Sequence, residues 1–212
     1  MHNTPRYGIL GGTFDPPHIG HLALAQEAYA RLGLDRVWFV PTGDPPHKPG
    51  RPISPAADRV AMVRLATEAD ARFGVSEVEL TLDGPSYTVR TLGMLRAGWG
   101  ADVELTLIVG WDMLLYLPQW HEPAGVVAAV ERVAAAYRPG FSADQTEQDR
   151  VTARVAGLAE KFVLLPGPLL GVSASEVRAR VASGLPIQYL VLDSVRSYIH
   201  EHDLFSPRPR DA

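Results

Sequence analysis

The regular alternation of apolar runs and amphipathic stretches constrains the fold of this chain more than any other feature. Short apolar runs rich in β-branched residues are typical of buried strands, and stretches with helical periodicity lie between them. The predicted strands cover residues 7–10, 36–40, 73–80, 103–109, 132–137 and 162–165. The predicted helices cover residues 19–32, 56–69, 87–95, 143–161 and 173–183. This alternation predicts an α/β fold built on a doubly wound, mostly parallel sheet.

Two segments do not fit the simple alternation directly. Residues 126–137 are rich in alanine and would form one long helix on propensity alone. We expect a strand at 132–137 instead, because the turn residues at 138–140 end the segment abruptly and a sixth strand completes the alternation. Residues 41–55 contain six prolines, which exclude a helix or a central strand. This segment should be a loop at the end of a strand, where α/β folds bind ligands.

The length of the chain, 212 residues, is compatible with one α/β domain. No internal repeat, low-complexity block or flexible linker interrupts it. We therefore expect a single domain over residues 1–206, with a small C-terminal helical part at about 173–205. Residues 207–212 are expected to form a disordered tail.

The charge balance and the lack of cysteine exclude several classes of protein. The chain has 20 Lys and Arg against 24 Asp and Glu, a formal net charge of −4, so nucleic acid and anionic membranes are poor partners. Without cysteine there is no disulfide, thiolate nucleophile or Cys-based metal site. No secretion signal or membrane-spanning apolar run of roughly 18 residues is present. We expect a soluble, cytoplasmic protein; its oligomeric state stays open, a homo-oligomer included.

The segment from Gly11 to His21, with the sequence GGTFDPPHIGH, carries the strongest functional signal. It leaves the first predicted strand and enters the first predicted helix. It is neither a Walker loop nor a GxGxxG fingerprint, because it lacks the lysine of the first and the glycine spacing of the second. Gly11 and Gly12 allow backbone amides to approach an anion, and the helix start adds unpaired N–H groups and a positive dipole end. We therefore predict a phosphate site here.

His18 and His21 lie three residues apart, so they share one face of the first turn if the helix begins near His18. Both side chains could then donate to one phosphate chain. Gly20, between them, removes a side chain where a base or ribose would need to lie. So short a motif supports equally well a pair of surface histidines that cap a helix. A zinc site has less support, because two histidines without further ligands form no closed site.

A second candidate phosphate site begins at Ser173. Ser173 and Glu176 have the spacing of a capping box, which predicts a helix from Ser173 to about Ser183. Capping alone explains these two residues. Arg178 lies on the first turns of the same helix, and its guanidinium is well shaped to bind phosphate oxygens.

These segments resemble a known family. The residues from Gly11 to His21 are similar to the signature of the HxGH nucleotidyltransferase superfamily. Further motifs follow in the order seen in bacterial nicotinate-nucleotide adenylyltransferases: Pro45-Pro46-His47-Lys48, Pro85-Ser86-Tyr87-Thr88, Gly110-Trp111-Asp112, Trp120 and Val172-Ser173-Ala174-Ser175-Glu176-Val177-Arg178. The resemblance extends from about residue 8 to 205 and implies a Rossmann-like nucleotidyltransferase fold. It also implies transfer of AMP from ATP to nicotinate mononucleotide in NAD biosynthesis, without a covalent enzyme intermediate.

The resemblance assigns roles to individual residues. It implies that His18, His21 and Arg178 are catalytic. The implied ATP-binding residues are Gly11, Gly12, Thr13, Phe14, His18, Gly20, His21, Gly110, Asp112, Ser173 and Arg178. The implied acceptor-binding residues are Thr42, His47, Lys48, Ser86, Tyr87, Thr88 and Trp120. The implied cofactor is Mg²⁺ held mainly by substrate phosphates, with no metal ligands from the protein.

Several of these residues also have ordinary structural interpretations. Asp112 follows a strand, where a carboxylate can bind ribose, but an isolated Asp there is more often a helix cap. Trp120 can stack on a pyridine ring, but an unplaced Trp is more often in the core. Lys48 can meet a phosphate, but a surface Lys is normally solvated. The start of the helix at Tyr87 and Thr88 can bind a small carboxylate, which would favour nicotinate over nicotinamide.

The sequence also allows other functions. The acceptor could be nicotinamide mononucleotide or another phosphorylated molecule such as phosphopantetheine. In a different class, the chain could be a nucleotide sensor that has lost catalysis, against which the intact His18, His21 and Arg178 argue. The cluster at 200–203, His-Glu-His-Asp, resembles a metal ligand set only superficially and is expected to be a solvated helix face.

Overall fold

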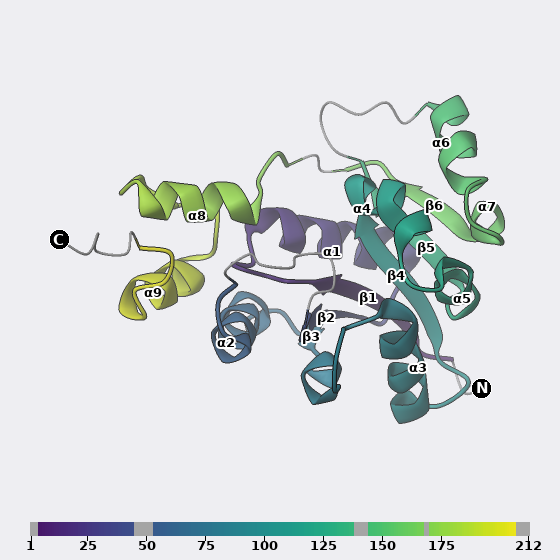
Figure 1. Ribbon diagram of the computed structural model, residues 1–212, viewed down its shortest axis with the longest axis horizontal. Helices are drawn as coiled ribbons and strands as arrows, with labels where there is room; N and C mark the ends of the chain where they lie inside the picture. The colour runs from purple at the N-terminus through teal and green to yellow at the C-terminus, as the bar shows by residue number, and fades with distance from the viewer. Residues whose placement is uncertain (1–3, 45–52, 138–143, 168–169, 207–212) are drawn as a thin grey trace.

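A six-stranded parallel sheet forms the centre of the computed structural model, which describes residues 4–44, 53–137, 144–167 and 170–206 (Figure 1). The strands are β1 (Arg6–Gly12), β2 (Arg36–Pro41), β3 (Phe73–Val75), β4 (Glu104–Gly110), β5 (Arg132–Ala136) and β6 (Phe162–Leu165). Their order is β3-β2-β1-β4-β5-β6, and every neighbouring pair is parallel. The predicted doubly wound fold is confirmed. In this order the connections reverse direction between β1 and β4, so the ligand crevice is expected at their carboxyl ends.

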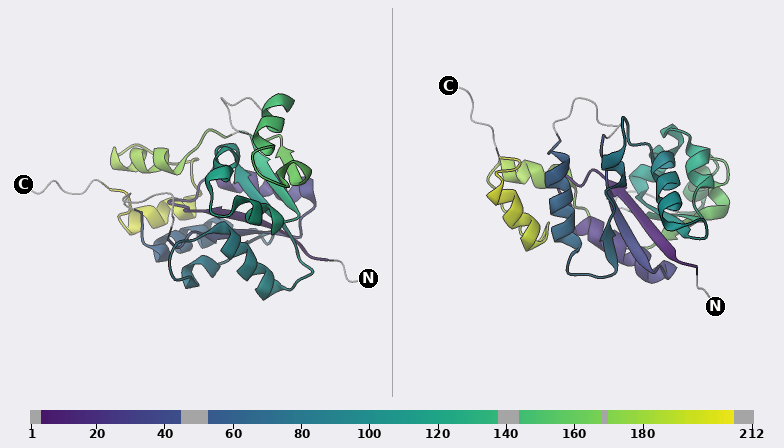
Figure 2. Two further views of the ribbon diagram at one scale, coloured as in Figure 1. Left: turned by 45° about the vertical axis from the view of Figure 1, so that its right-hand side comes forward. Right: turned by 90° about the horizontal axis from the view of Figure 1, so that it is seen from below.

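Helices cover both faces of the sheet (Figure 2). On one face lie α1 (Ile19–Leu32) and α2 (Ala56–Thr67). The other face is covered by α3 (Thr88–Trp99), α4 (Trp111–Tyr116), α5 (Pro123–Ala128), α6 (Gln145–Thr152) and α7 (Leu158–Lys161). Short 3₁₀ turns, η1 (Val78–Thr81) and η2 (Leu117–Gln119), complete the second layer.

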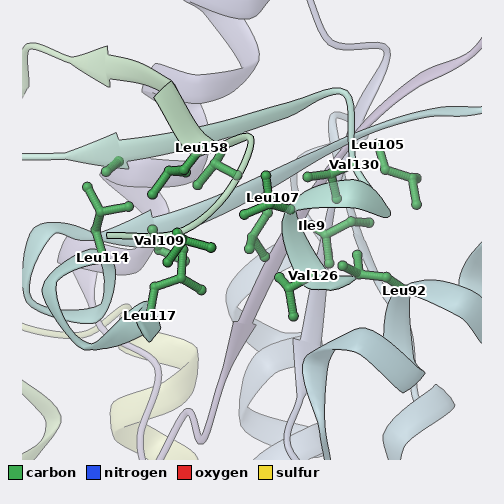
Figure 3. Packing of buried hydrophobic residues seen from close by; sticks show 14 of the residues in the cluster. Ile9, Leu92, Leu105, Leu107, Val109, Leu114, Leu117, Val126, Val130 and Leu158 are labelled. Atoms are coloured by element: carbon green, nitrogen blue, oxygen red, sulfur yellow. The ribbon is translucent and has the colours of Figure 1, made fainter. Parts of the chain in front are cut away.

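Successive strand residues belong to two different apolar layers. Ile9 and Leu107 pack under α3 to α5, in the layer drawn in Figure 3. Their neighbours Leu10 and Ile108 pack under α1 and α2. Side chains alternate across a strand, so burial of both faces requires apolar residues at nearly every position. This is why the strands read as continuous apolar runs.

Two C-terminal helices, α8 (Ala174–Ala182) and α9 (Asp193–Glu201), pack beside α2 at one end of the molecule (Figures 1 and 2). A third apolar cluster joins Met62 of α2 to Val177 of α8 and Ile199 of α9. The Tyr198 hydroxyl also donates to Asp58 Oδ1 at 2.9 Å. The predicted start of α8 is confirmed, because Ser173 is its N-cap and Ser173 Oγ accepts the Glu176 N–H at 3.2 Å.

The strand chosen at 132–137 is confirmed as β5 (Arg132–Ala136), whereas two other predicted elements were wrong. The strand expected at 73–80 ends at Val75, because β3 pairs only with β2 at the sheet edge. The chain then forms η1, whose partly buried side chain Val78 packs against the α3 layer. The helix expected at 143–161 is divided into α6 and α7, with Gly157 at a φ of 75° before α7. Among the described residues, no helix is long and apolar enough to span a membrane.

Candidate active site

A cavity of about 430 Å³ opens at the carboxyl ends of β1 and β4. This is the crevice where the strand order reverses, and its volume suits a small-molecule site. Fifteen residues predicted from the sequence to bind substrates line it: Gly11, Gly12, Thr13, His18, Gly20, His21, Thr42, Ser86, Tyr87, Thr88, Gly110, Asp112, Trp120, Ser173 and Arg178. His47 and Lys48 lie outside the described residues. The fold therefore brings together side chains from both halves of the sheet and from α8.

The two histidines occupy the first turn of α1. His18 is the N-cap, with extended backbone, and His21 is the third helical residue. Their rings stack with centroids 3.7 Å apart and planes 26° apart. His21 Nδ1 accepts the His18 backbone N–H at 3.1 Å. Because Nδ1 is an acceptor, the neutral ring of His21 carries its proton on Nε2 and donates from there.

The glycines of this segment have different roles. A Cβ added at Gly11 would meet no atom within 4 Å, so the space beside Gly11 is open to a ligand. At Gly20 a Cβ would lie 3.0 Å from His18 Nδ1. The His18 ring borders this space, and Gly20 lines the cavity, so its role beside a base or ribose stays a prediction. Gly20 allows the two histidine rings to stack.

The side chain of Phe14 lies outside the cavity wall, and the assignment of Phe14 as an ATP-binding residue stays a prediction. It is 2% exposed and has a φ of 50°, an uncommon backbone conformation for a bulky residue. Its ring lies against Gly12, where a Cβ would come within 3.1 Å of it. The same ring makes an edge contact with His21, with centroids 4.9 Å apart. The Phe14 ring therefore supports the turn between β1 and α1 through Gly12 and His21.

Arg178 connects α8 to the first turn. Its Nη1 donates to the Asp15 carbonyl at 2.5 Å, and its Nη2 donates to Ser175 Oγ at 3.2 Å. A second link is the Ile19 N–H, at the start of α1, which donates to the Leu190 carbonyl at 3.0 Å. The C-terminal helices thus place a guanidinium on the cavity wall beside the two histidines.

On the opposite wall, Ser86 lines the cavity and binds the neighbouring loop. Its Oγ accepts the N–H groups of Gly43 and Asp44 at 3.1 and 3.2 Å. Its own N–H donates to the Asp44 carbonyl at 2.9 Å. Ser86 therefore supports the 42–44 loop, and its assignment as an acceptor-binding residue stays a prediction. Thr88 is the first residue of α3, so its N–H belongs to the unsatisfied first turn of a helix.

Aromatic rings line the cavity beside the start of α3. Trp120 borders the cavity and also packs against the α3 layer, so it meets both the ligand-stacking and the core interpretation. Tyr87 stacks on His121, with ring centroids 4.2 Å apart and planes 27° apart. His121 was missed in the sequence, because this stacking depends on the tertiary fold. No local pattern marked it.

Asp112 is the second residue of α4 and lines the cavity. The N-cap of α4 is Gly110, so the helix-cap interpretation of Asp112 was wrong, and its contact with ribose stays a prediction. Trp111, which precedes it, is completely buried. Its ring makes edge contacts with Tyr137 and Phe162, each with centroids 6.2 Å apart. Trp111 is therefore part of the core, and the cavity wall is formed by its neighbours.

Two buried charged residues beside the cavity were also missed. Glu79 of η1 lines the cavity, is 7% exposed, and accepts the Thr91 hydroxyl at 2.7 Å. Burial raises the pKa of the Glu79 carboxyl above its ordinary value, against the hydrogen bond from Thr91. Arg59 of α2 is 2% exposed. Neither was singled out in the sequence, because charged residues on amphipathic elements normally face water.

Comparisons with known proteins match most of the chain. Residues 9–180 match the family model described as Cytidylyltransferase-like. The probable nicotinate-nucleotide adenylyltransferase of Thermomicrobium roseum is 44% identical over 201 residues, 94% of this chain and 91% of that protein. The chain belongs to the nicotinate-nucleotide adenylyltransferase family. The resemblance seen in the sequence is confirmed.

A second relative supports the family, and a solved structure supports the fold. The probable nicotinate-nucleotide adenylyltransferase of Dehalococcoides mccartyi is 41% identical and covers 93% of this chain and 96% of that protein. The structure of Plasmodium falciparum nicotinic acid mononucleotide adenylyltransferase complexed with NaAD has the same fold, with a TM-score of 0.75. That structure is 16% identical and covers 95% of this chain and 97% of its own chain.

In this adenylyltransferase chain the two walls of the cavity differ in chemistry. The wall of α1 and α8 presents imidazole and guanidinium groups, His18, His21 and Arg178. The wall of α3 presents aromatic rings and a helix start, Trp120 and Thr88. The first wall suits phosphate oxygens, and the second suits a flat ring that carries a small anion.

Proposed function

We propose that the protein transfers the AMP moiety of ATP to nicotinate mononucleotide, giving nicotinate adenine dinucleotide and pyrophosphate. The observation that carries this proposal is that one cavity joins a wall of imidazole and guanidinium groups to a wall of aromatic rings and a helix start. The names of the bacterial relatives and the NaAD complex of a protein with the same fold support it. Nucleic acid is not expected as a substrate, because the chain is acidic.

The reaction needs no covalent enzyme intermediate. An oxygen of the acceptor's 5′-phosphate attacks the α-phosphorus of ATP in line, the bond from that phosphorus to the bridging oxygen breaks, and pyrophosphate leaves. Catalysis then consists of positioning and charge stabilisation. His21 donates from Nε2 and His18 acts beside it on the phosphate chain. Arg178 neutralises the charge that develops on the leaving pyrophosphate.

Mg²⁺ fits this site as a companion of the substrates. Within the described parts of the chain, no group of three or more His, Cys, Asp or Glu side chains is arranged to hold a metal ion. Mg²⁺ usually keeps several waters and binds through substrate phosphates, so it requires no such group. When bound, it neutralises phosphate charge. The side chains of His18, His21 and Arg178 bind oxygens that the ion leaves uncovered.

The start of α3 provides the acceptor selectivity. The N–H and hydroxyl of Thr88 can donate to the nicotinate carboxylate, whereas Trp120 stacks on either pyridine ring. Hydrogen bonds to a charged group contribute about 1.5 to 3 kcal/mol each, so two of them give a preference on the order of a hundredfold or more.

Pyrophosphate release from ATP and Mg²⁺ with nicotinate mononucleotide, nicotinamide mononucleotide or phosphopantetheine tests the proposal. We expect the specificity constant, kcat/KM, to favour nicotinate mononucleotide by on the order of a hundredfold. Equal use of the two pyridine acceptors would contradict the carboxylate site, and no release with any acceptor would contradict the transferase itself.

Two variants separate the contributions to this preference. Thr88→Pro removes both donors but retains α3, because proline is tolerated at the first helical position and Tyr87 already has the extended backbone that precedes proline. It should erase the preference. Trp120→Ala should weaken both pyridine acceptors alike.

A further inference from the structure

Arg59 of α2 is a buried cation that forms no part of the cavity wall but contacts the loops that do. Its guanidinium donates to three backbone carbonyls: Nη1 to Thr13 at 2.9 Å, Nε to Ser54 at 3.1 Å and Nη2 to Gly43 at 3.4 Å. Thr13 follows β1, whereas Gly43 and Ser54 belong to the segment between β2 and α2. One side chain therefore holds the loops that leave two neighbouring strands.

The hydrogen bonds of Arg59 continue the pairing of β1 with β2 beyond the ends of the two strands. The last backbone bond from β1 to the chain after β2 runs from the Thr42 N–H to the Gly12 carbonyl, at 2.9 Å. The next residue on each chain is Thr13 or Gly43, and both offer a carbonyl to Arg59. Two carbonyls cannot bond to each other, so a donor between them is required. Arg59 supplies it and extends the pairing by one residue.

The loop held by Arg59 is fixed from the opposite side as well. A Cβ at Gly43 would lie 2.4 Å from the Glu79 carbonyl oxygen, so the backbone packs directly on η1. Ser86 binds the N–H groups of Gly43 and Asp44. The 43–44 segment is thus clamped between α2 and the start of α3, with no space to move toward η1.

The charge of Arg59 is balanced by carboxyl groups, although its hydrogen bonds go to carbonyls. Asp15 and Glu79 are 3% and 7% exposed and lie close enough to act electrostatically on it. Burial lowers the pKa of the Arg59 guanidinium, and these two carboxyl groups oppose that shift. The carboxyl groups make burial of the cation tolerable, while the planar fork fixes the positions of the three carbonyls.

We propose that Arg59 is a positioning residue that sets the distance between the two substrates. The Thr13 turn lies on the ATP wall, and Thr42 and Gly43 lie on the acceptor side. This inference rests on the proposed function, because it requires two substrates to meet in the cavity. In-line attack needs reacting atoms about 3 to 3.5 Å apart, and an error of about 1 Å costs on the order of a hundredfold in rate.

Arg59→Lys tests the proposal, with Arg96→Lys as a matched control. Lysine keeps the charge between Asp15 and Glu79 but cannot reach three carbonyls in one plane. Arg96 also donates to three carbonyls, those of Ala101, Val103 and Ala129, near the amino end of β4 and away from the cavity. Steady-state kinetics, Tm and the Kd of a non-hydrolysable ATP analogue without acceptor are measured on the full chain.

For Arg59→Lys we expect kcat to fall by roughly ten- to a hundredfold, while the Kd of the ATP analogue stays near its wild-type value. Arg96→Lys should lower Tm and leave kcat near wild type. A folded Arg59→Lys enzyme with wild-type kcat overturns the proposal, and so does an equal loss of kcat in Arg96→Lys.

Gly43→Ala provides a second route if Arg59→Lys does not fold. The added Cβ displaces the loop from η1 without changing any charge, so kcat should again fall while binding of the ATP analogue is retained. Wild-type kcat in this variant overturns the proposal. A wild type without transfer activity would overturn the proposed function as well, whereas an active wild type with equally active variants overturns only the role of Arg59.

Discussion

The two histidines of the first turn interact with each other as well as with the cavity. The His18 N–H holds His21 Nδ1, and the absence of a side chain at Gly20 allows their rings to stack. The His21 ring is therefore fixed in orientation and in tautomer before a substrate arrives. Such preorganised donors stabilise a transition state without reorganisation during the reaction.

His21→Ala should lower kcat by roughly two to three powers of ten, the usual effect of losing one preorganised donor. Alanine favours the helix, so α1 should remain folded. Steady-state kinetics and circular dichroism check this expectation. His200→Ala, at the exposed end of α9, is the control and should have wild-type kcat. A folded His21→Ala enzyme with near-normal turnover would refute the catalytic assignment.

The sequence could predict the shared face of His18 and His21, because helical spacing alone determines it. It could not predict the tautomer of His21 or the buried position of Phe14, which depend on hydrogen bonds and packing in three dimensions. Arg59 and Glu79 were hidden for a related reason. A charged residue on an amphipathic element is buried only when partners from other loops compensate it, and those partners are distant in sequence.

At the level of elements, α8 places the side chain of Arg178 at the cavity. Its N-cap Ser173 fixes where the helix begins, and Arg178 then points to the carbonyl of Asp15. The cap was readable from the sequence because it is local. The docking of α8 and α9 on α2 was not, because the apolar cluster that joins them draws on residues from three separate helices.

Arg178→Lys tests whether the Arg178 side chain of α8 binds ATP. Lysine keeps the charge but loses the planar fork that binds two oxygens, so the KM for ATP should rise and kcat should fall, with a smaller change in the KM for the acceptor. Arg180→Lys, on the same helix, is the matched control, because Arg180 donates to the Pro186 carbonyl and lies outside the cavity wall. Unchanged ATP kinetics in Arg178→Lys would place its function elsewhere.

The strands show where local patterns fail. Residues 132–137 looked helical by composition, yet the turn after them and the alternation of the whole chain correctly favoured a strand. The run at 73–80 looked like one strand, but the sheet edge offers pairing on one side only, and the chain buries its apolar residues by turning under α3. The apolar pattern of the sequence indicates whether a residue is buried, whereas the neighbouring elements determine which secondary structure buries it.

At the scale of the whole molecule, the buried carboxyl groups affect stability as well as the site. Glu79 has a folded pKa raised above its unfolded value, because burial disfavours its charged form. Between those two pKa values the folded state binds more protons than the unfolded state. Its contribution to stability is therefore present below the unfolded pKa, about 4.3, and is lost as pH rises through the folded pKa.

Glu79→Gln should make this pH dependence visible. Glutamine stays neutral and can still accept the Thr91 hydroxyl, so the free energy of unfolding of the variant, relative to wild type, should rise from pH 4 to pH 7. Denaturant unfolding at several pH values measures it. Glu77→Gln, an exposed position two residues earlier, is the control for loss of one charge. A difference that is flat or falls with pH would contradict a raised pKa at Glu79.

The bond between Arg178 and Asp15 joins residues 163 positions apart in the chain. The turn that carries the two histidines therefore leaves the ribosome long before the helix that carries Arg178. Contacts of such long sequence separation carry a large loop-closure cost and form after local ones. A nascent chain that already contains the histidine turn, and even all six strands, therefore still lacks the guanidinium of Arg178. The side chains of His18, His21 and Arg178 come together only after α8 has left the ribosome and docked.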